Sequence, residues 1–168
     1  MSSDSATPVG AFTGEIVGIY VAPAAGAPME ARRSAVVAAH RGIVGDRYAS
    51  GSGSWSANTR APRDVTLIER EAVDAARAEL AAAGVELCEA DTRRNLVTVG
   101  VPLGHLVDRT FRVGEVLLRG VKFSEPCAYL EQLLGSPGVR EAFVHRGGLQ
   151  AEVLTDGELR VGDPVTPA

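Results

Sequence analysis

The sequence lacks most of the features that mark secreted, membrane-spanning or nucleic-acid-binding proteins. Its two cysteines, Cys88 and Cys127, are too few for the disulfide framework of a small secreted protein and do not form a CxxC pair. No apolar run approaches the roughly 18 residues that a membrane helix needs. The polar start, MSSDSATPVG, has neither the basic nor the apolar region of a signal peptide. We therefore expect a cytoplasmic protein with reduced thiols and no membrane partner.

Several catalytic and binding motifs are also missing. The formal net charge is −4, so there is no overall basic field, and we expect no nucleic-acid partner. The three histidines are scattered and do not have the spacing of a zinc site. No GxSxG turn of a serine hydrolase occurs, and the glycines do not have the spacing of a nucleotide-binding loop.

The 168 residues are enough for one domain with a hydrophobic core. Residues 1–13 are expected to form a flexible tail, and residues 14–168 a single domain. Short β-branched, apolar segments with glycine bends predict about seven strands, including a hairpin through Asp156-Gly157. Residues 65–85 predict a strand that leads into an Ala-rich helix ending near Gly84, and residues 125–135 predict a second helix start.

Strands and helices do not alternate regularly along the chain, which argues against a doubly wound parallel sheet. The prediction is a mainly β fold with flanking helices (α+β), built as a bent, largely antiparallel β-barrel.

Cys127 lies in KFSEPCAYLEQL, directly after a proline and at the expected helix start. Backbone N–H groups and the dipole at a helix start stabilise a thiolate. A thiolate can attack a sulfur donor, carry a persulfide or ligate a soft metal. The alternative is a buried structural cysteine. Cys88, in VELCEAD, has no comparable setting.

Three further segments carry candidate binding residues. Arg93, Arg94 and Asn95 stand at the mouth of a predicted strand and could clamp an anion, because guanidinium groups bind phosphate through two hydrogen bonds. His40 and Arg47 lie in the glycine-punctuated loop HRGIVGDRY. Arg146 precedes a Gly-Gly turn. For each segment the alternative is a structural or solvated role.

Taken in order, these segments resemble the MOSC domain, named for the C-terminal domain of molybdenum cofactor sulfurases. The matching elements are GIYVAP, HRGIVGDRY, VTLI, TRRNLVTVGVPLGHL, FRVGEVLLRG, EPCAYLE and RGGLQAEVLTDGELRVGD, which span roughly residues 14–165. Each motif is weak alone, but their order, and a cysteine that follows a proline after the VGEVLLRG strand, are specific.

The resemblance implies a β-barrel-like fold with flanking helices and places the characteristic cysteine of the family at Cys127. In molybdenum-containing relatives this cysteine ligates the metal, and in sulfurases it is proposed to handle sulfur. The Arg-x-Asn element of the family falls on Arg93 and Asn95, where it meets the pterin-phosphate of the cofactor. The candidate cofactor-binding residues are therefore Arg93, Arg94, Asn95, Arg47, His40 and Arg146, with Cys127 as the catalytic residue and, if molybdenum is bound, the metal ligand.

The resemblance implies a stand-alone protein that binds molybdenum cofactor (molybdopterin), or carries sulfur on Cys127, as an oxidoreductase or a sulfur-transfer enzyme. Its partners would be a small-molecule substrate and a sulfur donor or electron-transfer protein. Pyridoxal phosphate is not expected, because the chain has no room for that domain and its only lysine, Lys122, lacks a matching context. Two alternatives stay open: a metal-free sulfur carrier in the biosynthesis of a sulfur-containing small molecule, and a non-catalytic module for an anionic ligand or a partner.

Overall fold

A computed structural model describes residues 10–53, 61–126 and 128–168. Most of the expected tail, residues 1–9, lies outside the described residues, and so does Cys127. None of the helices in the described ranges combines the length and the apolarity needed to cross a membrane.

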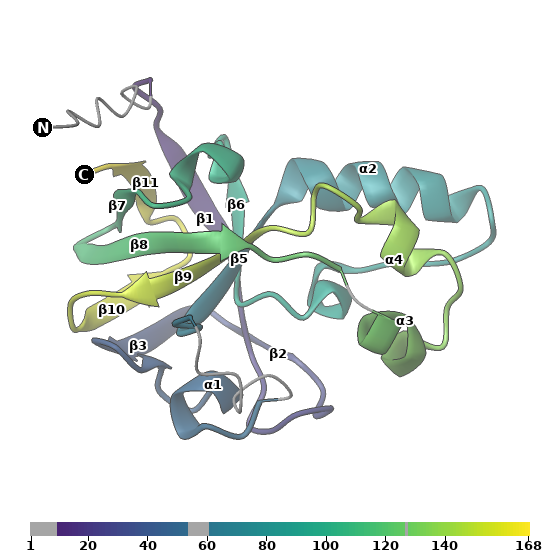
Figure 1. Cartoon of the computed structure of the whole chain (residues 1–168), viewed down its shortest axis with the longest axis horizontal. Helices are drawn as coiled ribbons and strands as arrows, with labels where there is room; N and C mark the ends of the chain where they lie inside the picture. The colour runs from purple at the N-terminus through teal and green to yellow at the C-terminus, as the bar shows by residue number, and fades with distance from the viewer. Residues whose placement is uncertain (1–9, 54–60, 127) are drawn as a thin grey trace, which may run out of the picture.

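Within the described ranges, seven strands close into a ring, because the last strand of the chain pairs with both the first strand and the seventh (Figure 1). In ring order the strands are β1 (Gly14–Val21), β11 (Pro164–Pro167), β7 (Thr110–Val113), β8 (Val116–Phe123), β9 (Leu149–Val153), β5 (Val65–Glu69) and β6 (Leu96–Val99). One more strand, β2 (Glu30–Arg32), extends the sheet from β1. The ring removes the exposed sheet edges that an open sheet would leave.

Of the pairs in this ring, only β5 and β6 run parallel, and the chain between them contains helix α2 (Arg70–Ala81). All other neighbours in the ring are antiparallel. The predicted fold class, a mainly β fold with flanking helices around a largely antiparallel barrel, is therefore confirmed.

The predicted hairpin through Asp156-Gly157 is wrong. Strand β9 pairs with β5 and β8, whereas β10 (Gly157–Arg160) pairs with β3 (Ser34–Ala38) in a separate sheet that also contains β4 (Gly42–Ile43). The turn residues explain the divergence. The Thr155 hydroxyl accepts the N–H of Leu117, and the Asp156 carboxylate accepts the N–H of Ala39 at 2.8 Å. These bonds direct the chain away from β9.

Alternating side chains along the ring strands build two cores. Leu67 and Leu96 point into the barrel, while their neighbours Ile68 and Val97 point outward to the helices, as the two-residue period of a strand requires. Each fully buried side chain of this size contributes about 1.5–3 kcal/mol. The outer core fixes a helical layer on one side of the barrel (Figure 1). Besides α2, this layer contains α3 (Ala128–Leu134) and α4 (Val139–Ala142).

The helix predicted within residues 65–85 is α2, and it ends close to Gly84, the glycine that predicted its end. Gly84 has a left-handed φ of 74°, and the N–H of Val85 closes the end by donating to the Leu80 carbonyl at 2.9 Å. Three further short helices complete the described elements: α1 (Arg47–Ser50), η1 (Glu89–Thr92) and η2 (Leu103–Leu106).

A buried carboxylate at the start of β5 gives the barrel a testable dependence on pH. Asp64 is buried and accepts the N–H of Val153 at 2.9 Å, and its burial raises the pKa of its carboxyl above the usual 3.8. A raised folded-state pKa means that the favourable contribution of Asp64 is complete below about pH 3.8 and is lost as the pH rises through the folded-state value.

Asp64→Asn keeps an acceptor for Val153 but cannot ionise. We expect it to match the parent near pH 3 and to become more stable than the parent as the pH rises towards 7. Urea unfolding across this pH range measures the difference. Asp74→Asn, an exposed carboxylate on α2, is the control and should shift stability by only a few tenths of a kcal/mol. A constant difference at all pH values would contradict the account.

Candidate functional site

Arg47 is buried at the first position of α1, where an aspartate neutralises it. The Asp46 carboxylate contacts the Arg47 guanidinium at 3.0 Å, and the two side chains are 0% and 4% exposed. The same carboxylate caps the helix by accepting the N–H of Tyr48, and it accepts the N–H of Ala22 at 3.0 Å. The Arg47 N–H returns a bond to the Ala22 carbonyl. Together these bonds fasten α1 to the chain just beyond β1.

The Arg47 guanidinium extends this link to the turn after η1. Its Nη2 donates to the backbone carbonyl of Arg93 at 3.0 Å, and its Nη1 lies 3.5 Å from the sulfur of Met29. Its Cζ lies 4.4 Å from the centre of the Tyr48 ring, within the range of a cation–π contact. Through these contacts Arg47 links α1 to the turn after η1.

Arg93 is the residue at this junction whose guanidinium keeps a spare donor. It ends η1 in the left-handed region, with φ 57°, and its Nη1 donates to the Ala27 carbonyl at 2.7 Å. Its Nη2 is buried and has no hydrogen-bond partner among the described residues. Burial, and then the positive charge of Arg47, lower the pKa of Arg93. An unsatisfied N–H on a buried guanidinium is costly, and an anion that reached it would form a charge-assisted hydrogen bond.

The turn that carries Arg93 is anchored from both sides of η1. The Glu89 carboxylate accepts the Tyr20 hydroxyl from β1 at 2.9 Å and the Arg70 guanidinium from α2 at 2.6 Å. Thr92 ties the short helix internally by donating to the Glu89 carbonyl at 2.8 Å. The position of Arg93 is therefore set by the barrel and by the helical layer together.

Asn95 is fully buried, and the barrel uses its side-chain amide. Its Oδ1 accepts the Thr66 N–H at 3.0 Å and the Thr66 hydroxyl at 3.3 Å, while its Nδ2 donates to the Tyr20 carbonyl at 3.1 Å. The amide joins β1 to the start of the parallel β5–β6 pair. The structure therefore does not offer Asn95 to a ligand directly, although the sequence names it with Arg93.

Arg94 turns away from Arg93 towards two loops. Its Nε donates to the Gly147 carbonyl at 2.8 Å, and its Nη2 donates to the Ser124 carbonyl at 3.1 Å. The three consecutive residues that the sequence groups into one anion clamp thus have three different settings. Only Arg93 carries a buried donor with no partner in the described part of the chain.

Three aromatic and basic side chains near this cluster were not among the predicted site residues. The Arg63 Cζ lies 5.8 Å from the centre of the Tyr48 ring. The Arg47 Cζ lies nearer to the same ring. Tyr48 and Tyr129 both act electrostatically on Arg93. Tyr48 directly follows Arg47 in the sequence, so its position in the motif HRGIVGDRY could have identified it as a neighbour of the site. Tyr129 and Arg63 come close only through the fold.

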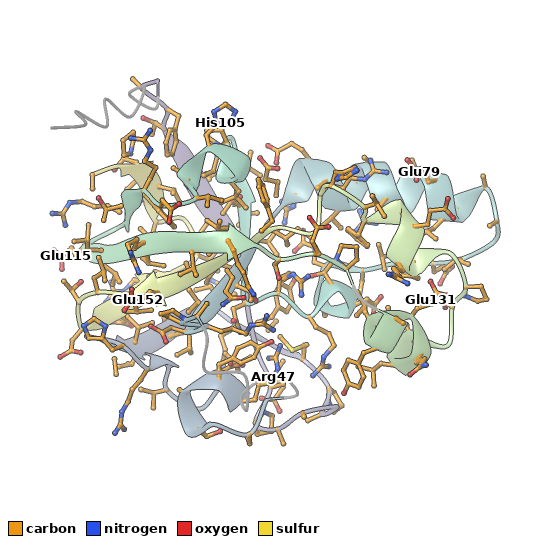
Figure 2. All side chains as sticks on the ribbon, viewed as in Figure 1. Arg47, Glu79, His105, Glu115, Glu131 and Glu152 are labelled. Atoms are coloured by element: carbon orange, nitrogen blue, oxygen red, sulfur yellow. The ribbon has the colours of Figure 1, made fainter. Side chains whose placement is uncertain are left out.

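His40 lies apart from Arg47 and Arg93. It is exposed in the turn between β3 and β4, with φ 58°, and its Nδ1 lies 3.0 Å from the Glu152 carboxylate on β9. Glu152 also pairs with Arg119 at 3.2 Å. Figure 2 shows Glu152 at the opposite end of the barrel from the helical layer and well separated from Arg47.

Arg146 belongs to the helical layer. Its Nε donates to the Ala142 carbonyl at 2.7 Å, and its guanidinium pairs with Glu79 on α2. Glu79 lies above the helices in Figure 2, while Arg47 lies below the barrel. The structure therefore brings Arg47 and Arg93 together, directs Arg94 to the Ser124 and Gly147 loops, and leaves His40 and Arg146 elsewhere.

Cys127, the predicted catalytic residue, lies outside the described residues. Its neighbours in the sequence, Pro126 and Ala128, are described, and Arg94 lines the same recess as Pro126. Among the residues that the structure describes, no three His, Cys, Asp or Glu side chains group in a way that could hold a metal ion.

Comparison with known proteins identifies one sequence family. Residues 44–166, about three quarters of the chain, match the MOSC domain. This range contains Arg47, the Arg93-Arg94-Asn95 turn and Cys127. No curated protein matches the sequence.

Solved structures share the fold at low sequence identity. The YuaD protein from Bacillus subtilis superposes with a TM-score of 0.73 at 17% identity, covering 93% of this chain and 96% of that one. YiiM from Geobacillus stearothermophilus gives 0.68 at 13% identity, with 92% and 75% covered. YiiM from Escherichia coli gives 0.60 at 17% identity, with 96% and 70% covered.

The anchor under the Arg93 turn has a spectroscopic signature. Burial, followed by the hydrogen bond and the negative charge of Glu89, raises the pKa of Tyr20 to about 12. We expect one of the three tyrosines to ionise near pH 12 in a rapid pH-jump titration followed by ultraviolet absorbance. Tyr20→Phe should remove that step, and Glu89→Gln should move it toward 10 while burial keeps it above that value.

The same shift implies that the stabilising contribution of Tyr20 is complete below pH 10 and is lost between about pH 10 and pH 12. A folded protein without an ionisation step near pH 12 would contradict the described Tyr20–Glu89 contact.

Proposed function

Because this chain belongs to the MOSC domain family, we propose that it binds molybdenum cofactor, with Arg93 holding the anionic pterin-phosphate and Cys127 providing the protein's sulfur ligand. The proposal rests mainly on one observation, the buried Nη2 of Arg93 that has no partner among the described residues. A buried N–H without a hydrogen-bond partner destabilises the folded protein by about 1–3 kcal/mol, and by more when the group is charged. A phosphate oxygen would satisfy it.

The cations near Arg93 support an anionic ligand. Arg47 lies against the Arg93 backbone, and its positive charge is one of the causes that lower the pKa of Arg93. Asp46 neutralises Arg47, but no carboxylate in the described ranges forms an ion pair with Arg93. An incoming anion would therefore meet a guanidinium that is partly desolvated and not yet neutralised, a setting in which charge-assisted hydrogen bonds are strong.

The metal-binding part of the proposal fits a cofactor that brings most of its own ligands. The described residues contain no three-residue metal cluster, and a dithiolene-bound metal needs only a soft thiolate from the protein. We assign this role to Cys127, which lies within the residues that match the MOSC domain. When bound, the cofactor would supply a redox-active metal centre for an oxidation or reduction of a small substrate.

Elemental analysis of protein made in a molybdenum-replete host tests the proposal. We expect molybdenum in the parent protein and a loss of at least about tenfold in occupancy for Arg93→Met, because a charge-assisted hydrogen bond in a buried site contributes about 1.5–3 kcal/mol. Cys127→Ala should also lose the metal. Arg146→Met, which removes an arginine that pairs with Glu79, is the matched control and should retain it.

Parent protein without molybdenum, before and after exposure to the cofactor, would overturn the proposal. The sulfur-carrier function would then be examined by incubation with a persulfide donor and intact-mass analysis. One added sulfur that is absent in Cys127→Ala would support that function.

A further inference from the structure

Arg94 joins two loops that are far apart in the sequence. One loop runs from Ser124 to Pro126, between the end of β8 and α3, and the other contains Gly147 and Gly148, before β9. Two N–H groups on one edge of the guanidinium serve the two loops separately: Nε donates to Gly147 and Nη2 donates to Ser124. Both acceptors are backbone carbonyls, so these bonds control main-chain position.

The two loops also touch each other directly. The N–H of Ser124 donates to the Gly148 carbonyl at 2.8 Å. Gly147 has no room for a side chain, because a Cβ there would overlap the Ser124 carbonyl oxygen and come within 3.1 Å of the Pro126 ring. This close approach brings the carbonyl oxygens of Ser124 and Gly147 near each other. Two N–H groups on one edge of the Arg94 guanidinium donate to both oxygens.

Arg94 lines the same narrow recess as Pro126, the residue that precedes Cys127. Thr92, Leu130 and Phe143 also line this recess, in which no space remains for a water molecule. Ser124 itself is buried. Water therefore cannot replace the guanidinium as the donor to these carbonyls without repacking of the loops.

We propose that Arg94 is a positioning residue, which fixes the backbone from Ser124 to Pro126 and thereby the approach of the chain to Cys127. Its role is to orient the segment that carries the thiol, and anion binding is left to Arg93. The inference deepens the proposed function, since it concerns the segment leading to the same cysteine. Lysine cannot replace Arg94 fully, because a single ammonium lacks the rigid two-donor edge.

The test uses the full chain as purified, with Cys88→Ala so that Cys127 is the only thiol. Arg94→Met and Arg94→Lys are compared with this parent by amide hydrogen exchange and by the rate of iodoacetamide alkylation as a function of pH. Arg77→Met is the matched control, because Arg77 also donates to a backbone carbonyl, that of Leu87, at 2.9 Å.

For Arg94→Met we expect exchange at Ser124 to be about tenfold or more faster, with exchange in α2 unchanged, and the pH profile of Cys127 alkylation to be displaced. Arg94→Lys should fall between Arg94→Met and the parent, and Arg77→Met should match the parent in both measurements. Should Arg94→Met fail to fold, Arg94→Lys alone decides: exchange at Ser124 that is faster than in the parent supports the inference.

An unchanged Ser124 exchange rate and an unchanged alkylation profile in both Arg94 variants would overturn the inference. Equal effects in Arg77→Met would also overturn it, because they would show only general loosening. Neither measurement requires a bound cofactor. A protein without molybdenum would therefore count against the proposed function and leave this test intact.

Discussion

The candidate site depends on the buried ion pair between Asp46 and Arg47. It joins the chain after β1 to the start of α1, and the arginine then holds the Arg93 carbonyl. A buried pair of this kind adds little over an apolar replacement, but removing one partner leaves a buried charge at a cost of about 3–5 kcal/mol. Its value here is geometric, because it fixes a left-handed residue at the end of η1.

Arg47, Arg93 and Arg94 have different roles, because their guanidinium groups donate to different acceptors. Arg47 and Arg94 donate to backbone carbonyls and join segments that are distant in sequence. Arg93 makes one such bond, and its buried Nη2 has no hydrogen-bond partner among the described residues. A guanidinium suits both tasks, since its planar donors can satisfy several oxygens at once. Which task each one performs is set by the turn in which it lies.

Much of the fold could be predicted because local patterns determine it. The short apolar, β-branched runs of β5 and β6, the Ala-rich run of α2 and the glycine at its end each act within a few residues, and these elements were confirmed. The hairpin at Asp156 was not, because the bonds from Thr155 and Asp156 to Leu117 and Ala39 are made between distant segments. For the same reason, the sequence could nominate Arg93, Arg94 and Asn95 but could not show that the barrel uses the Asn95 amide.

The central claim is that the Arg93 Nη2, which has no partner among the described residues, donates to a bound anion. NMR of the guanidinium itself tests this claim. Nitrogen-15 NMR of the arginine side chains, recorded while inorganic phosphate is added at constant ionic strength, reports each guanidinium separately. The account predicts a saturable shift of the Arg93 signal with no matching shift at Arg146. An Arg93 signal that stays unchanged, or that moves only in parallel with the exposed arginines, would contradict it.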